Sequence, residues 1–123
     1  MRFVPFGGQA PDPDAFLSTV LDGWGVQQRA KDFAPATIGT RRRVVMSLVD
    51  FSRRYPWEWT LADADEFFSH ARAVRNLSHG TVRSYQGAIK LFCDYACDPH
   101  YDWCEQAARS FGDRKSTRLN SSH

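Results

Sequence analysis

Two segments of the chain, residues 33–55 and 77–97, repeat one pattern at an offset of 44 positions. Each begins with a short loop, continues with hydroxyl and basic side chains, and ends in an apolar stripe. The aligned pairs include Thr37 with Thr81, Val45 with Ile89, Leu48 with Phe92 and Phe51 with Tyr95. A period that occurs twice is not a solenoid, which needs about three repeats to bury a core. The repeat therefore predicts two amphipathic helices that present matched hydrogen-bond donors from one bundle.

Apolar residues recur at three- and four-residue steps in four segments, which is typical of the buried face of a helix. With the caps and proline stops between them, they predict helices over 13–31, 36–55, 60–74 and 78–97, and a short fifth helix over 101–111. No segment alternates with period two for long enough to predict a strand. We therefore expect an all-α bundle of four to five helices. The aromatic residues expected to be mostly buried are Phe16, Trp24, Phe51, Phe67, Phe92 and Tyr95.

Composition and charge favour one packed domain with an anionic partner. Hydrophobic residues make up 42% of the 123 residues and aromatic residues 14%, which indicates a packed core and excludes disorder. Residues 29–90 hold 11 Lys or Arg against 6 Asp or Glu, and a basic centre fits a polyanion. No stretch approaches the ~18 apolar residues of a membrane span, and three cysteines suit a reducing compartment. We expect a cytoplasmic protein without a membrane partner.

The starts of the second and fourth helices are the candidate binding sites. Small and hydroxyl residues there let backbone N–H groups approach a phosphate. In a major groove, arginine reads guanine edges and glutamine reads adenine edges. Three consecutive arginines cannot all point the same way, so we expect one of them to lie along the core with its aliphatic stem. The candidate residues are Thr37, Thr40, Arg41, Arg42, Arg43, Ser78, His79, Thr81, Arg83, Ser84, Gln86 and Lys90.

We expect these two helix starts to lie on one face and to contact double-stranded DNA. For any single residue among them, an ordinary cap or a solvated face is the alternative interpretation. Nothing comparable predicts catalysis: the histidines have no acid and nucleophile in an organised motif, and no glycine-rich loop follows a strand. The sequence predicts no catalytic residue, no cofactor and no small-molecule substrate.

Cys93, Cys97, His100 and Cys104 form a C-x3-C-x2-H-x3-C pattern that could hold zinc. The spacing is not a usual zinc pattern, and the first two cysteines would share one helical face with aromatic residues. Small buried thiols are the commoner situation. We therefore predict no metal site here.

The chain divides into four segments. Residues 1–12 contain prolines and glycines and predict an irregular arm. Residues 13–98 form the helical domain, and residues 99–112 the start of a linker. Residues 113–123, DRKSTRLNSSH, resemble the translation of a common short-read sequencing adapter, which places the end of the natural sequence near Gly112 and excludes the tail from fold reasoning.

The order ATIGTRRRVVMSLVDFSRR, TLADADEFFSHAR, LSHGTVRSYQGAIKLFCDYA resembles the N-terminal core-binding domain of tyrosine recombinases, the phage-integrase family, over about residues 14–97. The resemblance implies a SAM-like helical domain that clamps one face of a recombination site during DNA integration and recombination, beside other recombinase protomers. In that family a separate C-terminal domain carries the catalytic arginines, histidine and nucleophilic tyrosine, and nothing here matches it. The resemblance therefore implies a fragment without catalysis, in which the nucleophile is none of Tyr55, Tyr85, Tyr95 and Tyr101.

Two other functions remain open. The chain could be a helical protein-interaction module whose basic helix starts bind an acidic partner, or, less well supported, a small zinc-binding regulator. Binding that requires duplex DNA and weakens steeply with salt would distinguish the first interpretation from both, because each neutralised phosphate steepens the salt dependence.

Overall fold

The computed structural model describes residues 12–111, and this part of the chain is helical without a strand. The elements are α1 (Pro13–Ala30), α2 (Pro35–Ser52), the 3₁₀ turn η1 (Pro56–Glu58), α3 (Leu61–Ala73), α4 (His79–Ala96) and α5 (Trp103–Phe111). The prediction of an all-α bundle with four long helices and a short fifth is confirmed. The expected irregular arm before Asp12 and the expected adapter-derived tail lie outside the described residues. None of the described helices has the length and apolar character needed to cross a bilayer.

Three helices begin at caps that the sequence already indicates. The Asp12 side chain accepts a hydrogen bond from the Asp14 N–H, and Pro13 occupies the first turn of α1. Thr60 and Asp63 form a reciprocal capping box at α3. Ser78 accepts the Thr81 N–H at the start of α4. These side chains satisfy amides that have no partner inside their helices.

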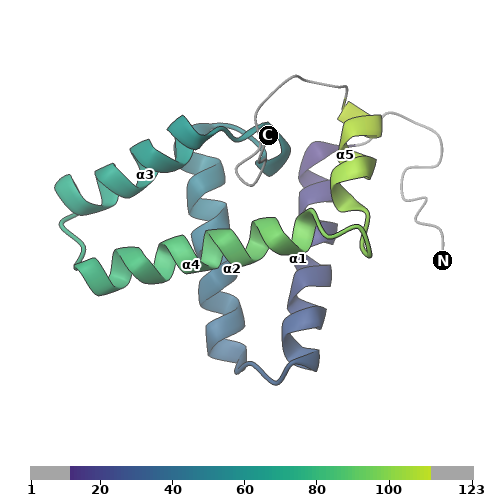
Figure 1. The fold of residues 1–123 in the computed structure, drawn as a ribbon, viewed down its shortest axis with the longest axis horizontal. Helices are drawn as coiled ribbons and strands as arrows, with labels where there is room; N and C mark the ends of the chain where they lie inside the picture. The colour runs from purple at the N-terminus through teal and green to yellow at the C-terminus, as the bar shows by residue number, and fades with distance from the viewer. Residues whose placement is uncertain (1–11, 112–123) are drawn as a thin grey trace.

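The four long helices form two antiparallel hairpins that cross. Figure 1 shows α1 and α2 as one hairpin and α3 and α4 as the other, with α4 running across α2 and α1. Val45 and Leu48 of α2 are fully buried, and Ile89 and Phe92 of α4 are also buried in this core. The apolar stripes of the sequence repeat therefore meet at the crossing of the hairpins.

Helix α2 ends three residues before its predicted end at 55. Arg53 takes a left-handed conformation with φ of 61°, and Pro56 favours the extended backbone found at Tyr55. The burial of Phe51 was also predicted wrongly, because 38% of this residue is exposed. Its ring contacts Phe67 and His70 at centroid distances of 5.5 and 5.1 Å, but in the last turn of α2 it extends past the helix crossing and remains partly in solvent.

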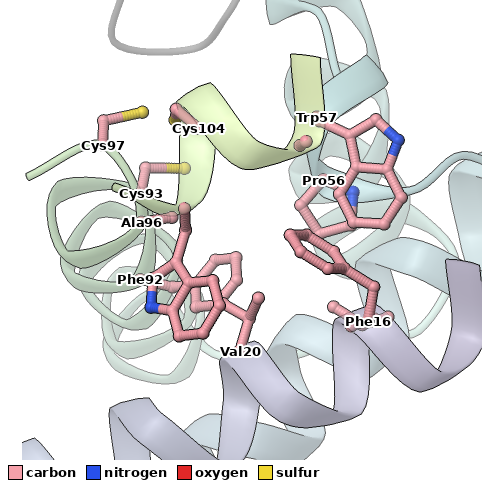
Figure 2. A pocket seen from close by; sticks show the side chains of 12 residues that line it. Phe16, Val20, Pro56, Trp57, Phe92, Cys93, Ala96, Cys97 and Cys104 are labelled. Carbon is pink, nitrogen blue, oxygen red and sulfur yellow. The ribbon is translucent and has the colours of Figure 1, made fainter. Parts of the chain in front are cut away.

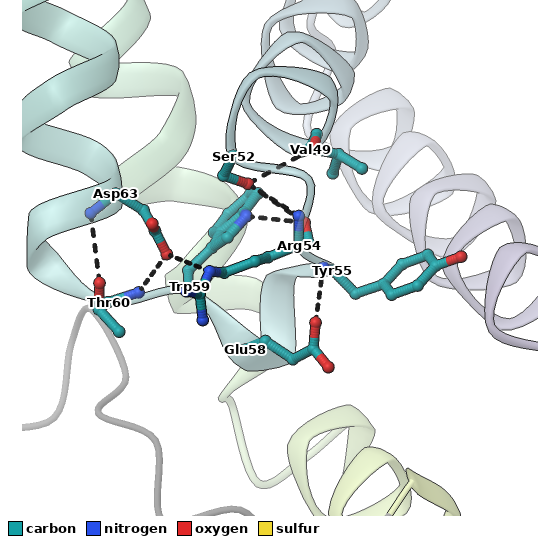
Figure 3. Close-up of polar contacts among 8 residues, drawn as sticks. All are labelled: Val49, Ser52, Arg54, Tyr55, Glu58, Trp59, Thr60 and Asp63. Atoms are coloured by element: carbon teal, nitrogen blue, oxygen red, sulfur yellow. Dashed lines mark hydrogen bonds and ion pairs between the residues drawn. The ribbon is translucent and has the colours of Figure 1, made fainter.

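Side chains replace the helical hydrogen bonds in the connection between α2 and α3. The Trp59 Nε1–H donates to the Arg54 carbonyl at 3.2 Å, and the Arg54 side chain reaches Asp63 Oδ2 at 3.6 Å (Figure 3). The Tyr55 N–H donates to Glu58 Oε1 at 3.2 Å. These bonds fix the path of the chain into α3, so that the two hairpins cross at a defined place.

Helix α5 packs on the bundle through aromatic side chains. The Trp103 Nε1–H donates to Tyr95 Oη at 2.8 Å. Phe111 stacks on Trp57 at 4.8 Å with an interplanar angle of 10°, and it meets the edge of Phe16 at 5.5 Å. A small apolar cavity of about 40 Å³ lies among α1, η1, α4 and α5 (Figure 2). The packed domain therefore continues to Phe111.

Candidate nucleic-acid interface

A groove of about 560 Å³ lies between residues 36–44 of α2 and residues 81–91 of α4. Its lining consists of Ala36, Thr37, Thr40, Arg41 and Val44 from α2, and Thr81, Ser84, Tyr85, Gly87, Ala88 and Leu91 from α4. The lining contains one cation and no carboxylate. Five of the predicted site residues therefore line one groove: Thr37, Thr40, Arg41, Thr81 and Ser84.

The sequence repeat explains this arrangement. Residues 37, 40, 41 and 44 lie at helical spacings i, i+3, i+4 and i+7 on α2, so they share one face. Residues 81, 84, 85 and 88 lie at the same spacings on α4, again with the offset of 44. Equivalent faces of the two repeats therefore oppose each other, with hydroxyl groups at 37, 40, 81 and 84.

The side chain of Arg41 reaches from the groove to α1 and to the connection between α1 and α2. Its Nη1 donates to Gln28 Oε1 at 2.9 Å, and its guanidinium lies 4.4 Å from the ring centroid of Phe33. Gln28 is 3% exposed, and its Nε2 donates to the Trp24 carbonyl at 3.4 Å. Sequence reasoning did not single out Gln28. The available signal was its place one helical turn after Trp24, on the continuation of the apolar stripe of α1.

The other two arginines of the run point elsewhere. Arg42 forms an ion pair with Asp22 of α1 at 2.9 Å. Arg43 is exposed, and its Nη2 donates to Thr40 Oγ1 at 3.2 Å, so it lies beside the groove. Within residues 12–111 Arg43 makes no ion pair. Its full charge is therefore open to solvent or to a ligand.

The remaining predicted residues of α4 do not line the groove. Ser78 caps the helix and also donates to Thr81 Oγ1 at 3.0 Å, while His79 Nε2 lies 3.1 Å from Arg72 Nη2 of α3. Arg83, Gln86 and Lys90 are exposed outside the groove lining, and Lys90 pairs with Asp94 at 3.1 Å.

The start of α2 lacks the cap that the other long helices have. Its N-cap residue is Ala34, and among the described residues no side chain accepts a hydrogen bond from the first turn. Ala36 and Thr37 belong to this turn and also line the groove. Helix N-termini carry a partial positive charge and free amide donors. Uncapped backbone amides therefore belong to residues that line the groove, which also contains hydroxyl groups and a guanidinium.

The three cysteines of the predicted pattern do not line this groove. Cys93, Cys97 and Cys104 are half-buried thiols that line the apolar cavity beneath α5 (Figure 2). Burial raises the pKa of Cys93 to about 12, so its thiol is protonated at neutral pH. Within residues 12–111, no group of three or more His, Cys, Asp or Glu side chains is placed to hold a metal ion.

One phenol is also held in its neutral form. The hydrogen bond from Tyr55 Oη to Asp14 Oδ1, 2.6 Å long, raises the pKa of Tyr55 to about 12. Tyr55, Asp14 and the nearby Glu58 lie outside the lining of the groove. This acidic surface is therefore separate from the groove lining, which holds Arg41 and no carboxylate.

No family model, curated protein or solved structure matches the chain.

Proposed function

We propose that this chain is a DNA-binding domain of the core-binding type found in tyrosine recombinases, and that the groove between α2 and α4 contacts the backbone of duplex DNA. The observation that carries the proposal is the meeting of two matched helix faces in one groove without a carboxylate. Hydroxyl groups, arginines and helix amides are the groups that commonly position a protein on phosphates.

The distribution of charge supports the same surface. Arg41 lines the groove and Arg43 lies beside it, while Arg83 is exposed on the neighbouring surface of α4. Arg83 makes no ion pair within residues 12–111. A polyanion would therefore meet cations whose charge is not already neutralised, and release of its counterions would favour binding.

The uncapped start of α2 adds a second type of donor. Because Ala34 provides no capping oxygen, the amides of Ala36 and Thr37 can donate to a phosphate at the end of the groove. In the proposed recombinase, this domain would hold one face of a recombination site in DNA integration and recombination. Catalysis would belong to a separate domain, and other protomers would bind alongside.

Fluorescence anisotropy with a labelled duplex, at several salt concentrations, tests the proposal. The chain is used both whole and ended at Gly112, so that the three basic residues of 113–123 cannot account for binding. We expect affinity to fall linearly with salt on logarithmic axes, with a slope of about −0.9 for each neutralised phosphate. Absence of salt-dependent binding by the shortened chain would refute the proposal.

Single substitutions separate positioning from base reading. Arg43→Ala should weaken binding to every duplex alike and lower the salt slope by about one. If Arg83 or Gln86 reads a base, its replacement by alanine should cost about 1–3 kcal/mol at one position of the site only. Arg109→Ala is the control, since this exposed arginine of α5 pairs with Asp102 and Glu105 outside the groove. Equal effects of Arg43→Ala and Arg109→Ala would contradict a localised site.

A chain that binds a polyglutamate as strongly as duplex DNA would instead favour the protein-interaction function. Duplex geometry matters to the proposed groove because two crossed helices must meet one backbone. A flexible polyanion lacks that geometry, so DNA binding should exceed polyglutamate binding at equal charge concentration. The same anisotropy assay, run as a competition, measures this difference.

A further inference from the structure

Gln28 is the only polar or charged residue that is buried among residues 12–111. It lies on α1, outside the groove, yet its side-chain oxygen accepts from Arg41 at 2.9 Å. Burying an amide is costly unless its groups are hydrogen-bonded. Here the oxygen has Arg41 as donor and the nitrogen has the Trp24 carbonyl as acceptor, so the amide is accommodated and Arg41 is held in one direction.

The second group that holds Arg41, the ring of Phe33, is also uncharged. The guanidinium lies over the Phe33 ring at 4.4 Å, and a ring face attracts a cation without cancelling its charge. Arg41 makes no ion pair with any residue of the described chain. Arg42 and Arg54, by contrast, pair with Asp22 and Asp63.

Carboxylates do lie in the hollow that adjoins the groove at Arg41. Asp94 and Asp98 line this hollow together with Arg41 and Lys31. Asp94 pairs with Lys90 at 3.1 Å, and Asp98 Oδ1 accepts the His100 N–H at 2.9 Å. Neither carboxylate is paired with Arg41. A fixed direction combined with a charge that no carboxylate pairs is what a preorganised anion-binding group requires.

We infer that Gln28 is a positioning residue, which orients Arg41 toward a DNA phosphate while leaving its full positive charge available. This inference rests on the proposed function of the groove. A glutamate at position 28 would keep the acceptor oxygen but pair the guanidinium with a carboxylate. The charge that Arg41 presents to DNA would then be largely cancelled, although the direction of the side chain would be similar.

Four variants test the inference by salt-dependent anisotropy, each with its thermal unfolding measured. Gln28→Glu should lower the salt slope by about one, so that a fourfold rise in salt weakens its binding about 3.5-fold less than it weakens the wild type. Gln28→Met keeps the charge of Arg41 and should weaken binding without changing the slope. Gln27→Glu is the charge-matched control: Gln27 lines the same hollow as Arg41, but among the described residues its side chain is hydrogen-bonded to Tyr101 and not to Arg41, so its slope should stay near the wild-type value.

Arg41→Gln removes the same charge without burying a carboxylate, and it provides the answer if Gln28→Glu does not fold. It should lower the slope by about one. A wild-type chain that does not bind DNA would overturn the proposed function and this inference together. The inference on Gln28 fails, while the proposed function stands, if the wild type binds and either Gln28→Glu or Arg41→Gln keeps the wild-type salt slope. It fails in the same way if the wild type binds and Gln27→Glu lowers the slope as much as Gln28→Glu does.

Discussion

Replacement of Gly23 by alanine should destabilise the domain, although alanine is the better helix former. Gly23 lies within α1, where a glycine costs about 1 kcal/mol relative to alanine. A Cβ atom at this position would lie 2.5 Å from Tyr95 Oη, which is closer than the two atoms can approach. The next nearest atoms, Cζ2 of Trp103 and Cζ of Tyr95, are 3.6 and 3.7 Å away, so the hydroxyl group is the sole obstacle among the described residues.

The magnitude follows from the contacts that must change. Overpacking costs about 1–3 kcal/mol, and displacing the Tyr95 hydroxyl also loses the hydrogen bond from Trp103, about 1 kcal/mol. After the gain in helix propensity, the free energy of unfolding should fall by about 1–3 kcal/mol. A loss of 2 kcal/mol would lower Tm by about 8–16 °C for a domain of this size. Circular dichroism at 222 nm during thermal and urea unfolding measures both quantities.

Two further variants make this prediction sharp. Gly87→Ala, in the open interior of α4 with no atom within 4 Å of the added methyl group, should stabilise by about 1 kcal/mol. In Gly23→Ala combined with Tyr95→Phe the obstructing oxygen is absent, so the pair should be more stable than Gly23→Ala alone. A Gly23→Ala protein as stable as wild type, or no rescue by Tyr95→Phe, would refute the reasoning.

Four other substitutions, at three positions, follow from the caps and the half-buried thiol of Cys93. Ala34→Ser should stabilise α2 by about 1 kcal/mol by supplying the missing cap. Ala34→Asp should stabilise α2 similarly but weaken DNA binding in the anisotropy assay, because its carboxylate competes with the DNA phosphate for the same amides. Thr60→Ala should lower the free energy of unfolding by about 1 kcal/mol in urea titrations. An unchanged free energy of unfolding would show that the capping box does not stabilise the domain. Burial raises the pKa of Cys93 from 9.0 to about 12, so its protonated thiol favours the folded state below pH 9 and this stability is lost as pH rises toward 12. In unfolding titrations across that pH range, the free energy of unfolding should fall less for Cys93→Val than for the wild type. Cys93 should also resist alkylation at pH 8 until urea unfolds the protein, as followed by mass spectrometry.

The sequence predicted the helices well because each one needs only a periodic stripe and a local cap. The stripe from Phe16 to Trp24 and the proline in the first turn of α2 define elements without any knowledge of their neighbours. Phe51 was misjudged for the opposite reason. Its place on a stripe was clear, but whether another helix covers the last turn of α2 depends on where the hairpins cross.

The candidate site was predictable only in part. The offset of 44 indicated that residues such as Thr40 and Ser84 occupy equivalent helix faces, and both line the groove. The directions of Arg41 and Arg42 were not predictable, because they depend on Gln28 and Asp22, which lie on another helix. Long side chains choose among partners that only the tertiary structure brings within reach.

The crossing of the two hairpins has a consequence for the order of events in folding. Each hairpin is held by contacts close in sequence, but α2 and α4 meet only after a loop of some forty residues has closed. Closing this loop costs conformational entropy before the apolar contacts between the hairpins can compensate for it. We therefore expect the rate-limiting step to be the docking of one hairpin on the other. In stopped-flow measurements, Val45→Ala and Ile89→Ala should mainly slow folding, whereas Phe111→Ala in the peripheral α5 should mainly speed unfolding. The helix crossing that forms the groove would thus also serve as the folding nucleus, so changes made there to alter DNA binding should alter folding rates as well.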